Sequence, residues 1–474
     1  MDVTASDRTN HFDLVLVGTG SGNAILSAAF DSWRVAIVEE GVFGGTCLNR
    51  GCIPTKMFVH AADTAETVRH GGHLGIDATI DAIRWRDIRD RVFDRIDPIA
   101  AGGEEYRVQR CPNITVFKGH GTFTGIKELA VTAADGTITV ITGTQFVLAA
   151  GARPHMPTID GLGQVTFHTS DTVMRLDDLP SRMTIVGGGF IAVELAHVFA
   201  AFGVAVTIVH RSALLLRQHE HEVAQVVTAA LRKRTNLLLG RHPTSVCEAA
   251  DGLISLTLDD GSTVESEVLL ITTGRVPNSD LLNVDATGVT THSDRRVVVD
   301  AHQRTVVDGI WALGDLSSPH MLKHVANHEA RVVQHNLLHP DALKCTDHRF
   351  VPAAVFTRPQ VASVGMTEVQ ARAAGIDVVC KVQAYGDVAY GWAMEDRDSF
   401  VKLVADRSTK QLVGAHIVGP QSSSLIQQLI TAMRFGIPAD ELAVDQYWIH
   451  PALPEVVENA LLGLDFAASH QDHS

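Results

Sequence analysis

Two cysteines near the N-terminus are the residues of this sequence with the clearest capacity for chemistry. Cys47 and Cys52 stand five positions apart, after a Gly-Gly pair and ahead of residues 56–65, which we predict to be helical. This spacing lets the two sulfurs meet as a small-ring disulfide, and a thiolate near a helix N-terminus has a lowered pKa. A loop this short would restrict the unfolded chain only weakly. The spacing therefore favours redox chemistry over a bracing role.

Two other interpretations of this cysteine pair stay open on spacing alone. Paired cysteines form half of many zinc sites, and two nearby thiols can also be inert. The other half of a zinc site has no candidate, because the remaining cysteines are scattered singly. They are Cys111, Cys247, Cys345 and Cys380. We expect no metal.

The composition of the whole chain excludes several classes of protein. Its 474 residues, 45% of them apolar, are enough for about three domains. A net charge of −15 argues against a nucleic-acid partner. No apolar run approaches the roughly 20 residues that span a bilayer, and residues 1–10 lack an apolar signal core. Six cysteines do not make a secreted disulfide framework. We expect a cytoplasmic protein without a membrane partner.

The cysteines follow a stretch that predicts a dinucleotide site. Residues 12–17 form an apolar run of strand length, followed by the turn Gly18-Thr19-Gly20-Ser21-Gly22 and an Ala/Ile/Leu-rich run that predicts a helix. A second apolar strand ends in Glu39, at the distance where an acid accepts hydrogen bonds from a ribose. Asn23 occupies the third glycine position of the usual fingerprint, which is a departure. Glycines there let the backbone approach a pyrophosphate at a helix N-terminus.

A second glycine turn predicts a second nucleotide site. Residues 183–186 predict a short strand, Gly187 and Gly189 open a G-x-G-x-x-A turn, and residues 193–202 continue as helix. The next strand, 204–209, ends in His210 and Arg211 instead of an acid, with Arg217 beyond. Cations attract a 2′-phosphate, so this site should prefer NADPH to NADH. A solvated basic patch is the alternative.

The order of the remaining motifs places the second unit as an insertion in the first. Gly151 follows the apolar strand 146–150, and Gly274 follows the apolar strand 268–272, so they mark the exits from the first and second units. A later strand ends in Gly314-Asp315, where an aspartate can bind a chain of hydroxyls.

From about Cys345 onward the pattern changes to that of an association domain. Residues 351–364 and 400–418 are β-rich, and residues 424–435 and 454–462 predict helices. His450 stands in a His-Pro turn five residues before Glu455, a spacing that suits an acid/base imidazole oriented by a carboxylate. Among 24 histidines, spacing alone does not select this one over a surface histidine.

Taken together, the motifs resemble one family. The runs GGTCLNRGCIPTK, ALGD and HPALPE, with both glycine turns in order, make residues 11–464 similar to pyridine nucleotide–disulfide oxidoreductases of the glutathione reductase and dihydrolipoyl dehydrogenase type. The resemblance implies an α/β fold with two Rossmann-like dinucleotide-binding domains, for FAD and NADPH, and a C-terminal α+β dimerisation domain. The expected boundaries are 1–152 and 274–344 for the FAD and central domain, 153–273 for the NADPH domain and 345–474 for dimerisation.

The resemblance also implies roles for single residues. Cys52 would be the thiolate nearest the flavin, forming a charge-transfer complex, and Cys47 would attack the substrate disulfide. Lys56 and Glu194 would form an ion pair near flavin N5. Across a homodimer interface, His450 of the partner subunit, oriented by Glu455, would be the acid/base. The residues that we expect at the two cofactors are Gly18, Gly20, Gly22, Glu39, Gly45, Thr46, Lys56, Gly151, Asp315, Gly187, Gly189, Arg211, Arg217 and Gly274.

The substrate expectation rests on a missing cation. In glutathione reductases an arginine after the first glycine turn holds a glutathione carboxylate, and the matching position here is Ala28, followed by Ala29 and Phe30. A disulfide without carboxylates suits this stretch, and mycothiol disulfide, a sugar–inositol conjugate, is such a substrate. A hydroxyl-rich substrate would use hydrogen-bonding and stacking groups, and the association domain offers Tyr447, Trp448, Tyr390 and Trp392, but we expect core packing for them.

Three rival interpretations remain. A dihydrolipoyl dehydrogenase would usually carry an acid where this chain has His210 and Arg211. A non-catalytic flavoprotein sensor would need neither His450 nor Glu455. A mercuric reductase would use a C-terminal cysteine pair, and no cysteine follows Cys380.

Overall fold

A seven-stranded sheet forms the first part of the molecule in the computed structural model, which describes residues 10–250 and 252–467. The central strand β1 (His11–Val17) pairs in parallel with β2 (Val35–Glu39) and with β6 (Ile138–Leu148), and β3 (Ile114–Lys118) and β16 (Ile310–Ala312) extend the parallel part. The antiparallel strands β4 (His120–Gly125) and β5 (Glu128–Thr132) complete it. The apolar runs of β1, β2 and β6 are buried because helices and loops cover both faces of the sheet, as in other parallel sheets.

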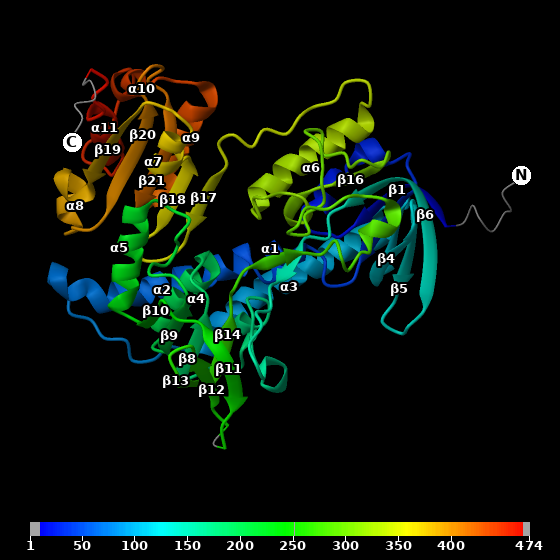
Figure 1. The fold of residues 1–474 in the computed structure, drawn as a ribbon, viewed down its shortest axis with the longest axis horizontal. Coiled ribbons are helices and arrows are strands. Elements are labelled where there is room, and N and C mark those ends of the chain that lie inside the picture. The colour runs from blue at the N-terminus through cyan, green and yellow to red at the C-terminus, as the bar shows by residue number, and fades with distance from the viewer. Residues whose placement is uncertain (1–9, 251, 468–474) are drawn as a thin grey trace, which may run out of the picture.

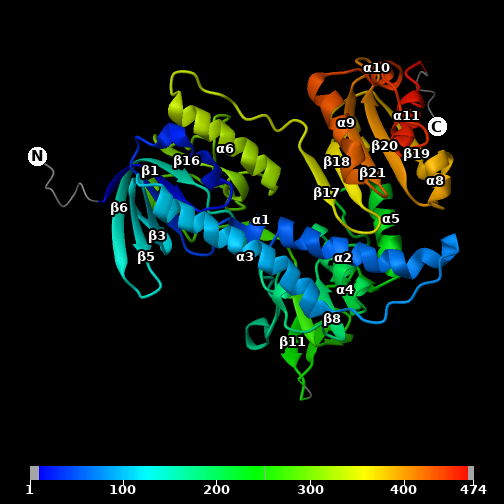
Figure 2. The same cartoon turned by 180° about the vertical axis from the view of Figure 1, so that it is seen from behind.

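Long helices connect this sheet to the rest of the protein. The short helix α1 (Gly45–Asn49) leads into α2 (Cys52–His70), and α3 (Trp85–Arg110) runs beside α2, as Figure 2 shows. The helix predicted over residues 56–65 is therefore confirmed as part of α2. α6 (Lys323–Leu338) follows β16. No helix among the described residues combines the length and the apolar character of a membrane span.

The predicted helix after the first glycine turn is wrong. The chain instead makes two 3-10 turns, Gly22–Ile25 and Ala28–Phe30, separated by extended backbone. Side chains from other elements take the carbonyls that helix amides would have bonded. Arg107 Nη2 donates to the carbonyl oxygens of Asn23 at 3.1 Å and Leu26 at 3.2 Å, and Gln334 Nε2 donates to that of Ile25 at 2.7 Å.

The second unit has its own parallel sheet, in the order β10-β9-β8-β14. Its strands are β8 (Arg182–Val186), β9 (Ala205–His210), β10 (Asn236–Leu239) and β14 (Val268–Ile271), with helices α4 (Phe190–Ala201) and α5 (His221–Arg232). A small antiparallel sheet adds β11 (Pro243–Glu248), β12 (Ile254–Leu258) and β13 (Thr263–Ser266). The strand and helix predictions around Gly187 are confirmed.

The two exit segments lie side by side. β7 (Ala152–Pro154) pairs antiparallel with β15 (Arg275–Pro277), so the chain enters and leaves the second unit through one two-stranded ribbon. Gly151 and Gly274 lie at opposite ends of this ribbon, where Gly151 accepts a hydrogen bond from the amide of Asn278 and Gly274 accepts one from the amide of His155.

The C-terminal unit is a five-stranded antiparallel sheet in the order β17-β18-β21-β20-β19. Its strands are β17 (Pro352–Val355), β18 (Val361–Gly365), β19 (Val378–Ala384), β20 (Phe400–Asp406) and β21 (Leu412–Val418). Its helices are α7 (Glu368–Ala373), α8 (Ala389–Ala393), α9 (Ser422–Phe435), α10 (Ala439–Val444) and α11 (Pro454–Leu462). Figure 1 shows this unit standing apart from the first sheet, joined to it by α6 and the extended segment that follows. The predicted α/β class is confirmed.

Candidate active site

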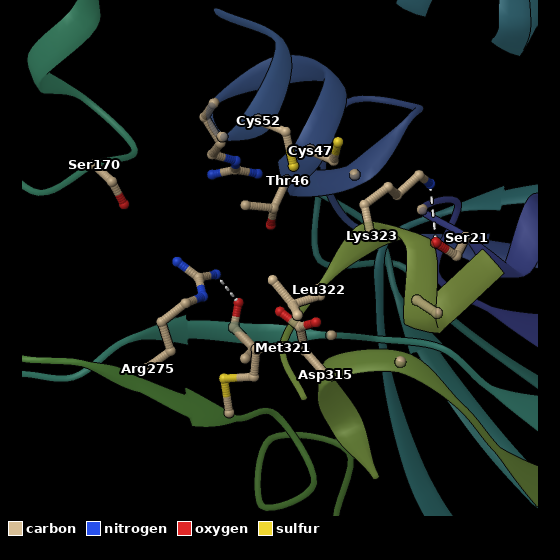
Figure 3. A pocket seen from close by; sticks show the side chains of 18 of the residues that line it. Ser21, Thr46, Cys47, Cys52, Ser170, Arg275, Asp315, Met321, Leu322 and Lys323 are labelled. Atoms are coloured by element: carbon tan, nitrogen blue, oxygen red, sulfur yellow. Dashed lines mark hydrogen bonds between the residues drawn. The ribbon is translucent and has the colours of Figure 1, made fainter. Parts of the chain in front are cut away.

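A cavity of about 1050 Å³ lies where the units meet. Its walls come from the first glycine turn, helices α1 and α2, the start of α4, the turn at residues 314–316 and the start of α6. In Figure 3, Thr46, Cys47 and Cys52 stand on one wall, while Asp315, Met321 and Leu322 lie across from them. The structure therefore brings the cysteine pair and the first nucleotide motif into one space.

Close backbone packing fixes the position of the cysteine pair. Cys47 lies within α1 and Cys52 is the first residue of α2. Gly45 faces Gly20 so closely that a Cβ on Gly45 would lie 2.7 Å from the Cα of Gly20. Asn49 Nδ2 donates to the carbonyl oxygens of Phe43 at 2.8 Å and Gly45 at 3.0 Å, which holds the turn of α1. The short helix α1 can pack directly against the first glycine turn because neither Gly45 nor Gly20 has a side chain, and this packing places the Cys47 thiol at the cavity.

The two thiols are free and hydrogen-bonded to each other, and their pKa values move apart. The hydrogen bond from Cys47 and the charge of Lys56 lower the pKa of Cys52 to about 7, against the opposing effect of burial. The same hydrogen bond, together with burial, raises the pKa of Cys47 far above its usual range. Cys52 is therefore the more acidic thiol of the reduced pair, and Cys47 is the thiol that keeps its proton.

The ion pair expected between Lys56 and Glu194 is present. Lys56 Nζ lies 2.8 and 2.7 Å from the two carboxylate oxygens of Glu194, which is only 3% exposed on α4. The backbone amide of Phe356, between β17 and β18, donates to Glu194 Oε1 at 2.9 Å. Burial raises the pKa of Glu194, and the charge of Lys56 opposes that rise. Three units of the chain therefore meet at one carboxylate beside Cys52.

The first glycine turn is held by close packing against Ala149 and by hydrogen bonds to the carboxylate of Glu39. Gly18 has a φ of +97°, and a Cβ there would lie 2.5 Å from the carbonyl oxygen of Ala149. Both oxygens of Glu39 accept hydrogen bonds, from the amide and hydroxyl of Thr19 at 2.8 and 2.6 Å and from the amide of Gly41 at 2.8 Å. The carboxylate therefore shapes the turn while it lines the cavity.

Asp315 places a half-buried carboxylate on the cavity wall. Its side chain lines the cavity, and burial raises its pKa. The amide of neighbouring Gly314 donates to Glu329 Oε2 at 2.7 Å, which fixes the turn. The charge of Arg275 and a hydrogen bond from its own backbone amide oppose the rise, and ligand hydroxyls would offset the remaining cost of burying the carboxylate. The residues present fit the ribityl chain of a flavin.

The second glycine turn is built in the same way. Gly187 has a φ of +139°, and a Cβ there would lie 2.5 Å from the carbonyl oxygen of Thr272. A Cβ on Gly188 would lie 2.5 Å from the ring of His210. Burial, and then the charges of Arg217 and Arg211, lower the pKa of His210. The two arginines are exposed at the end of β9, where the sequence predicted a cationic site.

His450 and Glu455 form the predicted pair but stand away from the cysteines. His450 Nδ1 lies 2.6 Å from Glu455 Oε1, and the amide of Ala452 donates to Glu455 Oε2 at 3.1 Å. The hydrogen bond from His450 lowers the pKa of Glu455. The His450 side chain is 72% exposed, and neither residue belongs to the described lining of the cavity. One chain alone therefore does not bring this pair to Cys47.

The sequence reasoning missed Lys323 and misjudged the aromatics. Lys323 Nζ donates to Ser21 Oγ at 2.9 Å, and its charge contributes to the lowered pKa of Cys52. The available signal in the sequence was a cation eight residues after Asp315 of the Gly-Asp motif. Tyr447 is fully exposed, Trp392 is 65% exposed and Tyr390 is 42% exposed, so the core packing expected for these three is wrong. Trp448 does pack, and its indole donates to the carbonyl oxygen of Ala443 at 2.9 Å.

Comparison with known proteins gives consistent matches along the chain. Residues 12–330 match the family described as pyridine nucleotide-disulphide oxidoreductase, and residues 351–461 match its dimerisation domain. The chain is 53% identical to a mycothione reductase of Mycobacterium tuberculosis, over 96% of this chain and 99% of that one. It is 33% identical to a dihydrolipoyl dehydrogenase of Halobacterium salinarum, over 100% and 99% of the two chains.

Solved structures agree with this assignment. The HOCl-induced flavoprotein disulfide reductase RclA of Escherichia coli, solved as a Cu(II) complex, superposes with a TM-score of 0.85. The match has 27% identity and covers 96% of this chain and 99% of that one.

The asymmetry of the two thiols can be measured directly. In the reduced protein, alkylation of Cys52 by iodoacetamide should follow a pKa of about 7. Cys47→Ala removes the hydrogen-bond donor and should move that pKa upward toward the value of an ordinary thiol. Cys47→Ser retains a donor and is the matched control. Peptide mass spectrometry over a pH series gives both values, and identical curves for the two variants would contradict the assigned cause.

Proposed function

The chain belongs to the pyridine nucleotide–disulphide oxidoreductase family, and we propose that it is an NADPH-dependent flavoprotein that reduces mycothiol disulfide to two mycothiols. The observation that carries the proposal is the hydrogen-bonded pair of Cys47 and Cys52 beside the Lys56–Glu194 ion pair, in a chain similar to a mycothione reductase along nearly its whole length. The enzyme is an oxidoreductase, and the reaction suits a cytoplasm, where thiols stay reduced.

The surroundings of the first glycine turn support a substrate without carboxylates. Ala28 and Ala29 are exposed on the second 3-10 turn and offer no cation. A carboxylate-bearing disulfide would lose a charge-assisted hydrogen bond there, worth about 1.5–3 kcal/mol. Mycothiol disulfide, a sugar–inositol conjugate without carboxylates, has no such hydrogen bond to lose.

The two cofactors divide between the glycine turns. Gly18, Glu39, Gly45 and Asp315 would hold FAD, and the second turn with Arg211 and Arg217 would hold NADPH. When bound, the flavin supplies hydride acceptance from the nicotinamide and two-electron reduction of the Cys47–Cys52 disulfide. The Lys56 ammonium, held by Glu194, would place a positive charge on the cavity wall that carries Cys52.

Thiol–disulfide exchange then follows from the two unequal thiols. Cys47, deprotonated by His450 of the partner subunit, attacks one sulfur of the substrate, so a Cys47–substrate bond forms and the substrate S–S bond breaks. The imidazolium returns its proton to the leaving thiolate, and Glu455 stabilises the imidazolium. The Cys52 thiolate next attacks Cys47 Sγ, so the Cys47–substrate bond breaks, the Cys47–Cys52 disulfide re-forms and the second product leaves as a thiolate, which takes its proton from solvent.

The dimer is required because His450 and the cavity are separate in one chain. The C-terminal unit is the family's dimerisation domain. Large apolar side chains of the C-terminal unit stay exposed, among them Phe435, Val444, Tyr447 and Ile449. Exposed apolar surface of this kind marks a protein interface. A second copy covering it would carry His450 toward the partner's cavity.

A substrate panel tests the proposed function. With NADPH and the purified holoenzyme, kcat/KM should be highest for mycothiol disulfide and lower by at least about tenfold for glutathione disulfide, the factor that one lost charge-assisted contact represents. Lipoamide and trypanothione disulfide complete the panel. Turnover of lipoamide above all others, or of none of the four, would overturn the proposal.

Mixed dimers test whether His450 acts across the interface. Cys47→Ser and His450→Ala should each be inactive as homodimers. A co-expressed heterodimer of the two variants, purified by two different tags, should regain one working site, because one cavity then has both Cys47 and His450. If the heterodimer stays as inactive as its parents, the acid/base acts within its own chain or is another residue.

A further inference from the structure

An ion cluster that the mechanism does not use lies between the second unit and the C-terminal sheet. Lys402 on β20 has a side chain only 4% exposed. Its Nζ lies 2.8 Å from Glu222 Oε1, 3.0 Å from Glu368 Oε2 and 3.3 Å from Glu220 Oε2. A buried ammonium is tolerated only when carboxylates compensate its lost hydration. Two of these carboxylates come from the second unit and one from α7.

Glu220 is the member of the cluster that ties the two units together. It is 3% exposed and directly precedes α5 of the second unit. Its Oε2 faces Lys402, and its Oε1 accepts a hydrogen bond from the amide of Glu368 at 2.6 Å. Buried His416 of β21 lies 3.9 Å from the same oxygen. Both oxygens of this carboxylate are therefore held by residues of the C-terminal unit.

The segment that ends at Glu220 carries the proposed phosphate-reading arginines. It begins after β9 with Arg211 and continues through Arg217 to Gln218 and His219, which line the cavity. Leu216 within it has a φ of +51°, an unfavourable conformation for a leucine, and its amide donates to the carbonyl oxygen of Gly188 in the second glycine turn at 2.8 Å. Strained backbone of this kind persists only where neighbouring contacts hold it.

We propose that Lys402 is a positioning residue for the dinucleotide: through Glu220 it anchors residues 211–219 to the C-terminal unit and so holds Arg211 and Arg217 where a 2′-phosphate binds. The inference rests on the proposed preference for NADPH. It extends that proposal to a residue outside the second unit, and it makes the affinity for NADPH depend on the contact between two units.

The chain offers a matched control at the other end of the same helix. Lys233, directly after α5, pairs with Asp398 of the C-terminal unit at 3.7 Å, and both side chains are exposed. Lys233→Met therefore removes an ion pair between the same two units without touching residues 211–219. Exposed pairs of this kind contribute little to stability.

The experiment compares the holoenzyme with Lys402→Met, Lys233→Met and Arg211→Ala. In Lys402→Met, as in Arg211→Ala, KM for NADPH should rise about 3- to 30-fold, while KM for NADH and kcat stay near the wild-type values. Titration of the oxidised holoenzyme with NADP⁺ should show the same loss without turnover. Lys233→Met should match the wild type. Equal losses for NADPH and NADH, or no loss, would overturn the inference.

Two further comparisons separate the possible failures. A wild-type enzyme without preference for NADPH contradicts the proposed function, whereas a wild-type preference that Lys402→Met retains contradicts only this inference. If Lys402→Met does not fold, Glu220→Gln carries the test, because glutamine keeps an acceptor for the Glu368 amide but loses the charge. It should show a smaller NADPH-selective loss, and an unchanged NADPH/NADH ratio would overturn the inference.

Discussion

The buried carboxylate of Glu194 is the point on which the arrangement of the site depends. It comes from α4, pairs with Lys56 of α2 and accepts the Phe356 amide of the C-terminal unit. A carboxylate buried this deeply would be strongly destabilising without compensation, so the three units hold one relative position. Because α2 begins at Cys52, that position also decides where the reactive sulfurs stand.

The electrostatics of the site follow from the same placement. Lys56 and Lys323 both favour the thiolate of Cys52, and the hydrogen bond from Cys47 adds to their effect. The same hydrogen bond raises the pKa of Cys47, so this thiol keeps its proton. The imidazole of His450, oriented by Glu455, lies away from the cavity of its own chain, which is why the proposed mechanism takes this base from the partner subunit.

Residue type and spacing within short stretches of the sequence predicted those parts of the structure that contacts between neighbouring residues determine. The glycine turns, the strands beside them and the distance between His450 and Glu455 were expected from residue type and spacing. The ion pair of Lys56 and Glu194, 138 residues apart in the sequence, was expected only from the family resemblance. The 3-10 turns after Gly22 were not, because they depend on Arg107, 84 residues from Asn23. The amide of Phe356 carries no side-chain signal, and Tyr447 was assigned to a core because aromatic residues are usually buried. The cluster around Lys402 joins α5, α7 and β20, and no single window of sequence contains it.

The central claim is that reducing equivalents from a nicotinamide end on the sulfurs of Cys47 and Cys52. The direct measurement is anaerobic addition of NADPH to the oxidised holoenzyme, followed by rapid alkylation and mass spectrometry of the peptide that contains both residues. The account predicts a peptide linked by a disulfide before NADPH and alkylated at both cysteines afterwards, with the other four cysteines unchanged. The same alkylation pattern before and after NADPH would contradict it.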